Sequence, residues 1–364
     1  MSESTARPRN LSIEALRLVA IAGIAIFHTF QPWFAAATDG TWQAGAPALA
    51  ALGCVSLLGA YGNNVFFLVS GFFLVPRAAR AAGEPGYWGR QAHALGRRAL
   101  VIGASVALYA AIALAVSTWV VPLDGVSLGQ AGWLLGGLEF IWVYLACVAA
   151  VPVIGWTWQR VRRPRAVVAA LVAAVFAVNA YIAFISPGSE VRGLLEWRKL
   201  MSAVTYLVAF LAGGALGEKN LARPGRALAA SCGAALLLEG GAAVAGNTWL
   251  LGALSFKSTS LLSFALAAAS VALAAQGRAV AADTPARRVV AALAPSILGF
   301  YVMQSMFFSL WRPVADAACD AGLAAGGQAG LLVAGTVASL VLLCIMLLLD
   351  RATRVPLLRA LHLA

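Results

Sequence analysis

The stretch Gln328–Leu349, QAGLLVAGTVASLVLLCIMLLL, runs for 22 residues without one charged side chain. An α-helix needs about 20 apolar residues to cross the hydrocarbon core of a bilayer. Nine further apolar runs precede this one, near residues 18–34, 52–76, 99–121, 131–157, 166–186, 201–217, 227–246, 250–275 and 289–311. The sequence therefore predicts an all-α fold, a polytopic integral membrane helix bundle with about ten transmembrane helices.

The composition supports the same class of fold. Of the 364 residues, 62% are hydrophobic and 11% are charged, and the mean hydropathy is +0.86. A soluble domain has about a quarter of its residues charged, so this chain could not cover a globule of its size with polar surface. Because no linker interrupts the apolar pattern, we expect residues 1–364 to form a single transmembrane domain.

The net charge of +12 is explained by membrane topology. If the amino terminus is cytoplasmic, 21 of the 26 basic residues fall in cytoplasmic segments and Lys257 falls inside a span. The four in outer loops are Arg192, Arg198, Lys199 and Arg312. This bias obeys the positive-inside rule, which predicts a multi-pass plasma-membrane protein with both termini in the cytoplasm. Lipid is then the expected partner of the basic excess, and no nucleic acid is required.

Two other patterns at the sequence level are weaker. The basic amino terminus and the triplet Ala35–Ala37 resemble a signal peptide, but bulky Trp33 and Phe34 adjoin the cleavage point, so we expect the span to be retained. The cysteines show no CxxC spacing and no Cys/His cluster, so we expect neither a disulfide framework nor a metal site. These five cysteines are Cys54, Cys147, Cys232, Cys319 and Cys344.

The first span and the segment before it contain the most informative polar residues. Arg17 and His28 are eleven residues apart, which is close to three helical turns, so they share one helix face about 16 Å apart. Glu14 is three residues before Arg17 and can pair with it. Ser12 is a candidate cap for the start of the helix. An ionisable group inside a membrane indicates function, although His28 could instead be a structural residue hydrogen-bonded to a neighbouring helix.

Three segments resemble a known family. The stretch SIEALRLVAIAGIAIFHTF (Ser12–Phe30) resembles the first helix of the acyltransferase-3 family of integral membrane acyltransferases, in which an Arg, ten residues and a His recur. The stretch NNVFFLVSGFFL (Asn63–Leu74) resembles the Phe-Phe-x-x-Ser-Gly-Phe segment of that family and includes Ser70. Near Tyr301 a third resemblance departs from the family, because Gln304 replaces its usual His.

The resemblance implies transfer of an acyl group, often acetyl, from acyl-CoA to a hydroxyl of a surface polysaccharide or similar envelope molecule. Acyl-CoA would be a donor substrate and not a permanently bound cofactor. Arg77 and Arg80 match an Arg-x-x-Arg motif of the family and could clamp the CoA phosphates, with Arg97 and Arg98 as further candidates. All four could instead be present only because of the positive-inside rule.

Other polar residues within the predicted spans are secondary candidates. Glu139 could orient the imidazole, and Lys257 could bind a pyrophosphate or a carbonyl. Glu239 and Lys257 could equally form a structural ion pair.

Two classes of function follow from these residues. The first is an O-acyltransferase in which His28 acts as general base. The second is a transporter or flippase for an envelope precursor, since buried His, Glu and Lys also suit proton coupling. The absence of two corresponding broken helices in the two halves of the sequence disfavours the transporter.

Overall fold

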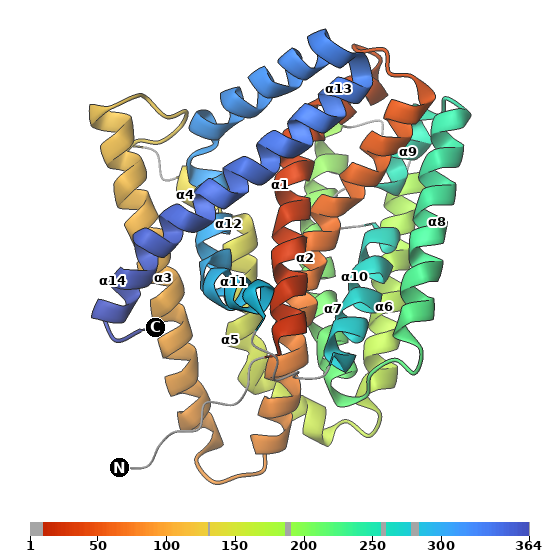
Figure 1. Ribbon diagram of the computed structural model, residues 1–364. Helices are drawn as coiled ribbons and strands as arrows, with labels where there is room; N and C mark the ends of the chain where they lie inside the picture. The colour runs from red at the N-terminus through yellow and green to blue at the C-terminus, as the bar shows by residue number, and fades with distance from the viewer. Residues whose placement is uncertain (1–9, 130–131, 186–190, 256–259, 278–283, 364) are drawn as a thin grey trace.

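Helices form almost all of the computed structural model, which describes residues 10–129, 132–185, 191–255, 260–277 and 284–363 (Figure 1). No strand occurs within these ranges, which confirms the all-α prediction. The helices are α1 (Leu11–Asp39), α2 (Ala46–Ala81), α3 (Tyr87–Trp119), α4 (Gly132–Gly136), α5 (Glu139–Arg160), α6 (Pro164–Ala180, followed by a π-helical turn to Ile185), α7 (Val191–Glu218), α8 (Pro224–Val244), α9 (Thr248–Leu254), α10 (Leu261–Gln276), α11 (Pro285–Leu293), α12 (Ile297–Met306), α13 (Phe308–Ala352) and α14 (Arg354–Ala360).

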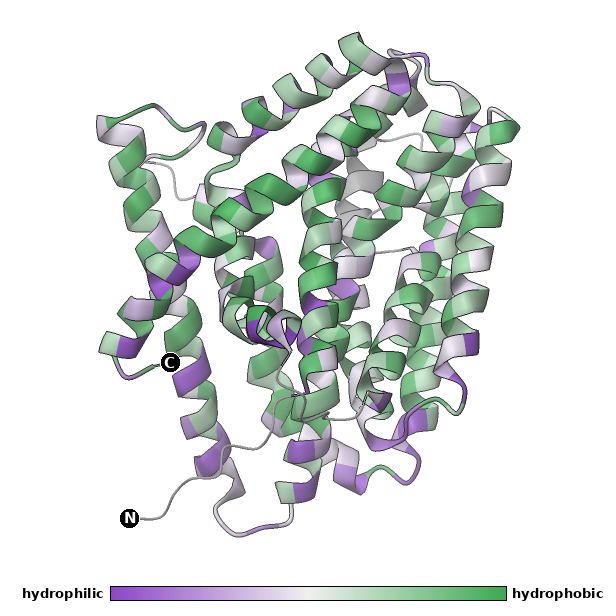
Figure 2. Ribbon diagram, viewed as in Figure 1, coloured by the Kyte–Doolittle hydropathy of each residue, from purple (hydrophilic) through white to green (hydrophobic). Residues whose placement is uncertain are grey.

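The membrane-spanning character of the helices is confirmed. Within the described ranges, nine helical segments are long and apolar enough to cross a bilayer, and the shorter apolar helix α10 lies where the eighth span was predicted. Hydrophilic residues gather at one end of the bundle, where α2 joins α3, α5 joins α6 and α7 joins α8 (Figure 2). The charge pattern predicts these three connections to be cytoplasmic, and their position at one end of the molecule is consistent with that prediction.

Helix α2 forms the centre of the bundle, with α1, α5, α7, α8 and α10 packed around it. Small residues allow the closest of these contacts. A Cβ on Gly71 would collide with the carbonyl oxygen of Phe210 in α7, and a Cβ on Gly213 would collide with that of Leu68 in α2. Close backbone approach through small residues is a recurring way for membrane helices to associate.

The carboxyl-terminal helices depart from the prediction. The segment that was expected to be an outer loop, between residues 311 and 328, is helical and belongs to α13. Helix α13 turns back on itself at Gly326–Gly327, where Gly327 has φ 59° and ψ −149°, a conformation that glycine adopts far more readily than other residues. The two arms of this hairpin come into contact at Gly322 and Gly330 (Figure 1). The predicted loop residue Arg312 is therefore a buried helical residue.

Two local predictions also need correction. The cap of α1 is Asn10 and not Ser12, because the Asn10 side chain accepts hydrogen bonds from the backbone amides of Ser12 and Ile13 at 3.1 and 3.3 Å. The predicted single span 250–275 is divided into α9 and α10. Polar Asn247 and Ser260, whose side chains accept from the Leu250 and Ser263 amides, begin these two helices.

Candidate active site

Helix α1 presents its two predicted functional residues to two different cavities. Arg17 lines a cavity of about 490 Å³, which we call the basic cavity. His28 lines a second cavity of about 510 Å³, which we call the histidine cavity. The eleven-residue spacing puts the two side chains on one face of the helix but about 16 Å apart along its axis. They therefore cannot act on the same atom.

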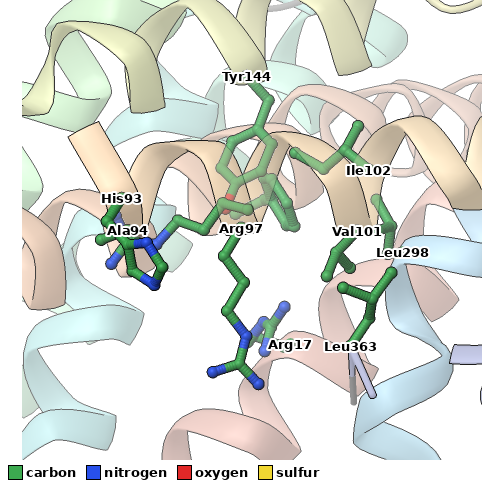
Figure 3. A pocket seen from close by; sticks show the side chains of 11 residues that line it. Arg17, His93, Ala94, Arg97, Val101, Ile102, Tyr144, Leu298 and Leu363 are labelled. Carbon is green, nitrogen blue, oxygen red and sulfur yellow. The ribbon is translucent and has the colours of Figure 1, made fainter. Parts of the chain in front are cut away.

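The basic cavity lies between α1 and the first turns of α3 (Figure 3). Its basic side chains are Arg17, His93, Arg97 and Arg98. The Arg17 Nη1 atom donates to the Glu14 carboxylate at 3.0 Å, which confirms the predicted pairing of these two residues. The guanidinium carbon of Arg17 also lies 5.8 Å from the centre of the Phe66 ring, a cation–π distance.

The structure separates the four arginines that were predicted to hold CoA. Arg97 and Arg98 are among the described residues that line the basic cavity, whereas Arg77 and Arg80 are exposed near the end of α2 and do not line it. Arg77 is still close enough to interact electrostatically with Arg98. His93, in the first turns of α3, also lines this cavity, although the sequence analysis did not identify it as a candidate. Its position on the helix face four residues before Arg97 is the signal that could have identified it.

The histidine cavity is lined by hydrogen-bonding side chains from five helices, α1, α2, α5, α7 and α12. Asn63 donates from Nδ2 to the Tyr206 hydroxyl at 2.9 Å, which holds α2 against α7. Ser305 donates to the carbonyl oxygen of Gly137. Besides His28, the polar lining residues are Gln31, Asn63, Glu139, Ser202, Tyr206, Tyr301, Gln304 and Ser305. The predicted candidate Glu139 and the residue that replaces the family's second His, Gln304, are thus in the same cavity as His28.

An aromatic layer separates the two cavities. We define it as Phe66, Phe140, Tyr144 and Tyr301. The Phe66 ring centre lies 5.1 Å from that of Phe140, 4.7 Å from Tyr144 and 5.3 Å from Tyr301, while Phe140 and Tyr301 are stacked at 4.5 Å. Phe66 and Tyr144 also line the basic cavity, whereas Phe140 and Tyr301 line the histidine cavity.

Ser70 supports the aromatic layer and lines neither cavity as described. Its hydroxyl donates to the carbonyl oxygen of Phe66 at 2.8 Å and interacts with the Tyr144 hydroxyl. The candidate Lys257 lies outside the described residues. Its suggested partner Glu239 is fully buried in α8, and neither of its carboxylate oxygens has a hydrogen-bond partner within the described part of the chain.

The comparisons with known proteins agree with this architecture. A family model described as an acyltransferase domain, that of the acyltransferase-3 family, matches residues 10–350. Neither a curated protein nor a solved structure matches the chain at a significant level. The family match includes every residue that lines the two cavities, apart from Leu363 of the basic cavity. The chain therefore belongs to the acyltransferase-3 family, and it is a multi-pass membrane acyltransferase.

Proposed function

We propose that this protein is an O-acyltransferase that moves an acyl group, such as acetyl, from acyl-CoA to a hydroxyl of a cell-envelope glycan or a similar acceptor. The observation behind this proposal is that α1 presents Arg17 to one cavity and His28 to another, with only the aromatic layer between them. Two adjoining cavities of this kind suit a transfer between an anionic donor and a hydroxylic acceptor.

The basic cavity suits the nucleotide end of the donor. Guanidinium groups bind phosphate through paired, charge-assisted hydrogen bonds, and Arg17, Arg97 and Arg98 present three of them. In the predicted orientation this cavity faces the cytoplasm, where CoA is found. The adenine end of CoA would stay there, and the pantetheine arm would extend along α1 toward His28.

The aromatic layer must part for the thioester to reach His28. Phe66 lies at the centre of the layer and contacts each of its three other members. Since the Arg17 guanidinium lies over the Phe66 ring, a donor that moves Arg17 on binding would weaken a contact that holds this ring. The layer thus offers a reason for the thioester to be admitted only when the nucleotide is bound.

The chemistry assigned to His28 is general base catalysis. The imidazole takes the proton of the acceptor hydroxyl while that oxygen attacks the thioester carbonyl carbon, which gives a tetrahedral intermediate. The intermediate collapses with cleavage of the carbon–sulfur bond, and the imidazolium returns the proton to the departing CoA thiolate. The products are the acyl ester and free CoA, and no covalent enzyme intermediate is required.

The acceptor is assigned to the histidine cavity because of its lining. Hydroxyl and amide groups from Asn63, Tyr206 and Gln304 surround His28, and such groups hydrogen-bond to sugar hydroxyls. In the predicted orientation this cavity lies in the outer half of the membrane, on the side of the envelope glycans. Lipid and the acceptor are accordingly the expected partners at this end.

Radiolabelled acetyl-CoA added to the purified protein in detergent tests the enzymatic function. A transferase releases CoA and labels an acceptor, whereas a transporter or flippase does neither. The acceptor is identified by mass spectrometry of envelope glycans from cells with and without the protein. If acetyl-CoA and longer acyl-CoA donors all stay intact with both added glycan fractions and membrane extracts, the proposed activity is ruled out.

A further inference from the structure

Pro32 leaves the backbone carbonyl of His28 without its usual helical partner. Inside an α-helix each carbonyl accepts a hydrogen bond from the amide four residues later. The residue four positions after His28 is Pro32, which has no backbone N–H and yet lies inside α1. The carbonyl of His28 is therefore open to another donor, in a helix that has membrane on its outer side.

That donor is Arg312, from the first arm of α13. Its Nη1 atom donates to the His28 carbonyl oxygen at 2.8 Å. The rest of the guanidinium is occupied by Asp316, one turn further along α13. Nε donates to Oδ2 at 2.8 Å, and Nη2 donates to Oδ1. Arg312 is only 8% exposed, so this cation is held within the bundle by these two partners.

The arrangement depends on the shape of a guanidinium. One edge of the planar fork pairs with a carboxylate, and the remaining N–H groups stay available in a fixed direction. Asp316 fixes the plane, and the free Nη1–H then points at the His28 carbonyl. A side chain fixed at one end and bonded to the backbone at the other restrains the rotation of His28 about the axis of α1.

We propose that Arg312 is a positioning residue for His28. It supplies the hydrogen bond that Pro32 removes, and so it fixes the direction in which the imidazole enters the histidine cavity. This inference rests on the proposed role of His28 in acyl transfer. Arg312 does not line either cavity, so its effect on the reaction passes through His28.

Restoring the missing amide provides a rescue experiment. Arg312→Leu is expected to lower kcat about 10- to 150-fold, the loss that corresponds to one hydrogen bond from a charged group, with little change in donor KM. Pro32→Ala in the Arg312→Leu protein supplies an N–H four residues after His28 and should recover most of kcat. Pro152→Ala is the matched control, since Pro152 also lies inside a helix but on α5. Recovery with Pro152→Ala, or no recovery with Pro32→Ala, would contradict the proposal.

A spectroscopic measurement tests the contact without relying on activity. The chain has three histidines, so His93→Gln and His362→Gln leave His28 alone. In protein purified without a histidine tag, [1-¹³C]histidine then labels only the His28 carbonyl. Arg312→Leu should move this resonance upfield, as expected for a lost hydrogen bond, and adding Pro32→Ala should move it back. If Arg312→Leu does not accumulate, Asp316→Asn should give a smaller upfield shift.

The two measurements separate the two hypotheses. A resonance that does not respond to Arg312 or Asp316 substitution overturns the positioning role, whatever the activity. If the wild-type protein transfers no acyl group, the proposed function falls, and the resonance still decides whether Arg312 holds the carbonyl.

Discussion

At the scale of single residues, Arg17 has contacts that a lysine would not reproduce. Its guanidinium pairs with Glu14 and lies over the Phe66 ring while lining the basic cavity. We expect Arg17→Lys to lower kcat/KM for acyl transfer roughly 10- to 150-fold, because an ammonium lacks the planar fork. Arg226→Lys, at an exposed site on α8, is the control and should be neutral. If Arg17→Lys transfers acyl groups at nearly the wild-type rate, Arg17 has no role in the site beyond its positive charge on the cytoplasmic side.

His28 can be tested by removal of its imidazole. If it is the general base, His28→Ala should lose about 10²- to 10⁴-fold in kcat. Donor binding should change little, because the basic cavity does not include His28. The control His362→Ala removes an exposed imidazole near the carboxyl end of the chain and should leave the rate unchanged. The measurement is label transfer from acetyl-CoA at matched protein amounts, and a His28→Ala protein that retains transfer would end the mechanism.

The position of the arginines also predicts which of them bind the donor. Paired replacement of Arg97 and Arg98 by Ala should raise the KM for acyl-CoA roughly 10- to 150-fold, the loss of one charge-assisted hydrogen bond, with a smaller change in acceptor KM. Arg80→Ala should have little effect, because Arg80 is exposed outside the basic cavity. If Arg80→Ala raises the KM for acyl-CoA and the Arg97 and Arg98 replacement does not, the phosphate site would instead be the Arg-x-x-Arg motif at Arg77 and Arg80.

At the scale of helices, the contact between α2 and α7 depends on glycine. A Cβ at Gly71 would collide with the backbone of Phe210, and backbone cannot move aside as a flexible side chain can. We expect Gly71→Ala to destabilise the protein by about 1–3 kcal/mol, as overpacking does elsewhere, and to lower the melting temperature in detergent. Gly103→Ala on α3 meets nothing within 4 Å and should be neutral or slightly stabilising. An unchanged melting temperature for Gly71→Ala would mean that α7 moves away without a penalty.

The helices show what the sequence alone could predict. Apolar length and charge bias located the membrane segments, because both are local properties of the chain. The phase of α1 predicted that Arg17 and His28 share one face, and in the structure each of them lines a cavity. The prediction of an outer loop at the first arm of α13 was wrong. Its charged residues Arg312, Asp316 and Asp320 are typical of a loop unless their partners are known. Arg312 meets His28 across 284 residues, a separation at which no local pattern indicates contact.

At the scale of the whole molecule, the orientation in the membrane can be measured. In a Cys-free protein, a single cysteine at Thr41, in the α1–α2 connection, should react with an impermeant thiol reagent added outside cells. A cysteine at Lys219, between α7 and α8, should react only after the membrane is permeabilised. Both native residues are exposed, so accessibility within the protein does not limit the reaction. The opposite pattern would invert the bundle and place the basic cavity outside.

The contacts between α1 and α13 have a consequence for biogenesis. His28 and Thr29 are bonded to Arg312 and Ser339, which follow them by 284 and 310 residues. At about 5–20 residues per second, roughly 15–60 s of translation separates His28 from Arg312. During that interval the nascent first helix holds an open carbonyl, and no chain released before α13 can complete the histidine cavity. A chain released before α13 therefore lacks Phe308 and Trp311 of the histidine cavity and the Arg312 contact, so we expect such a fragment to be inactive.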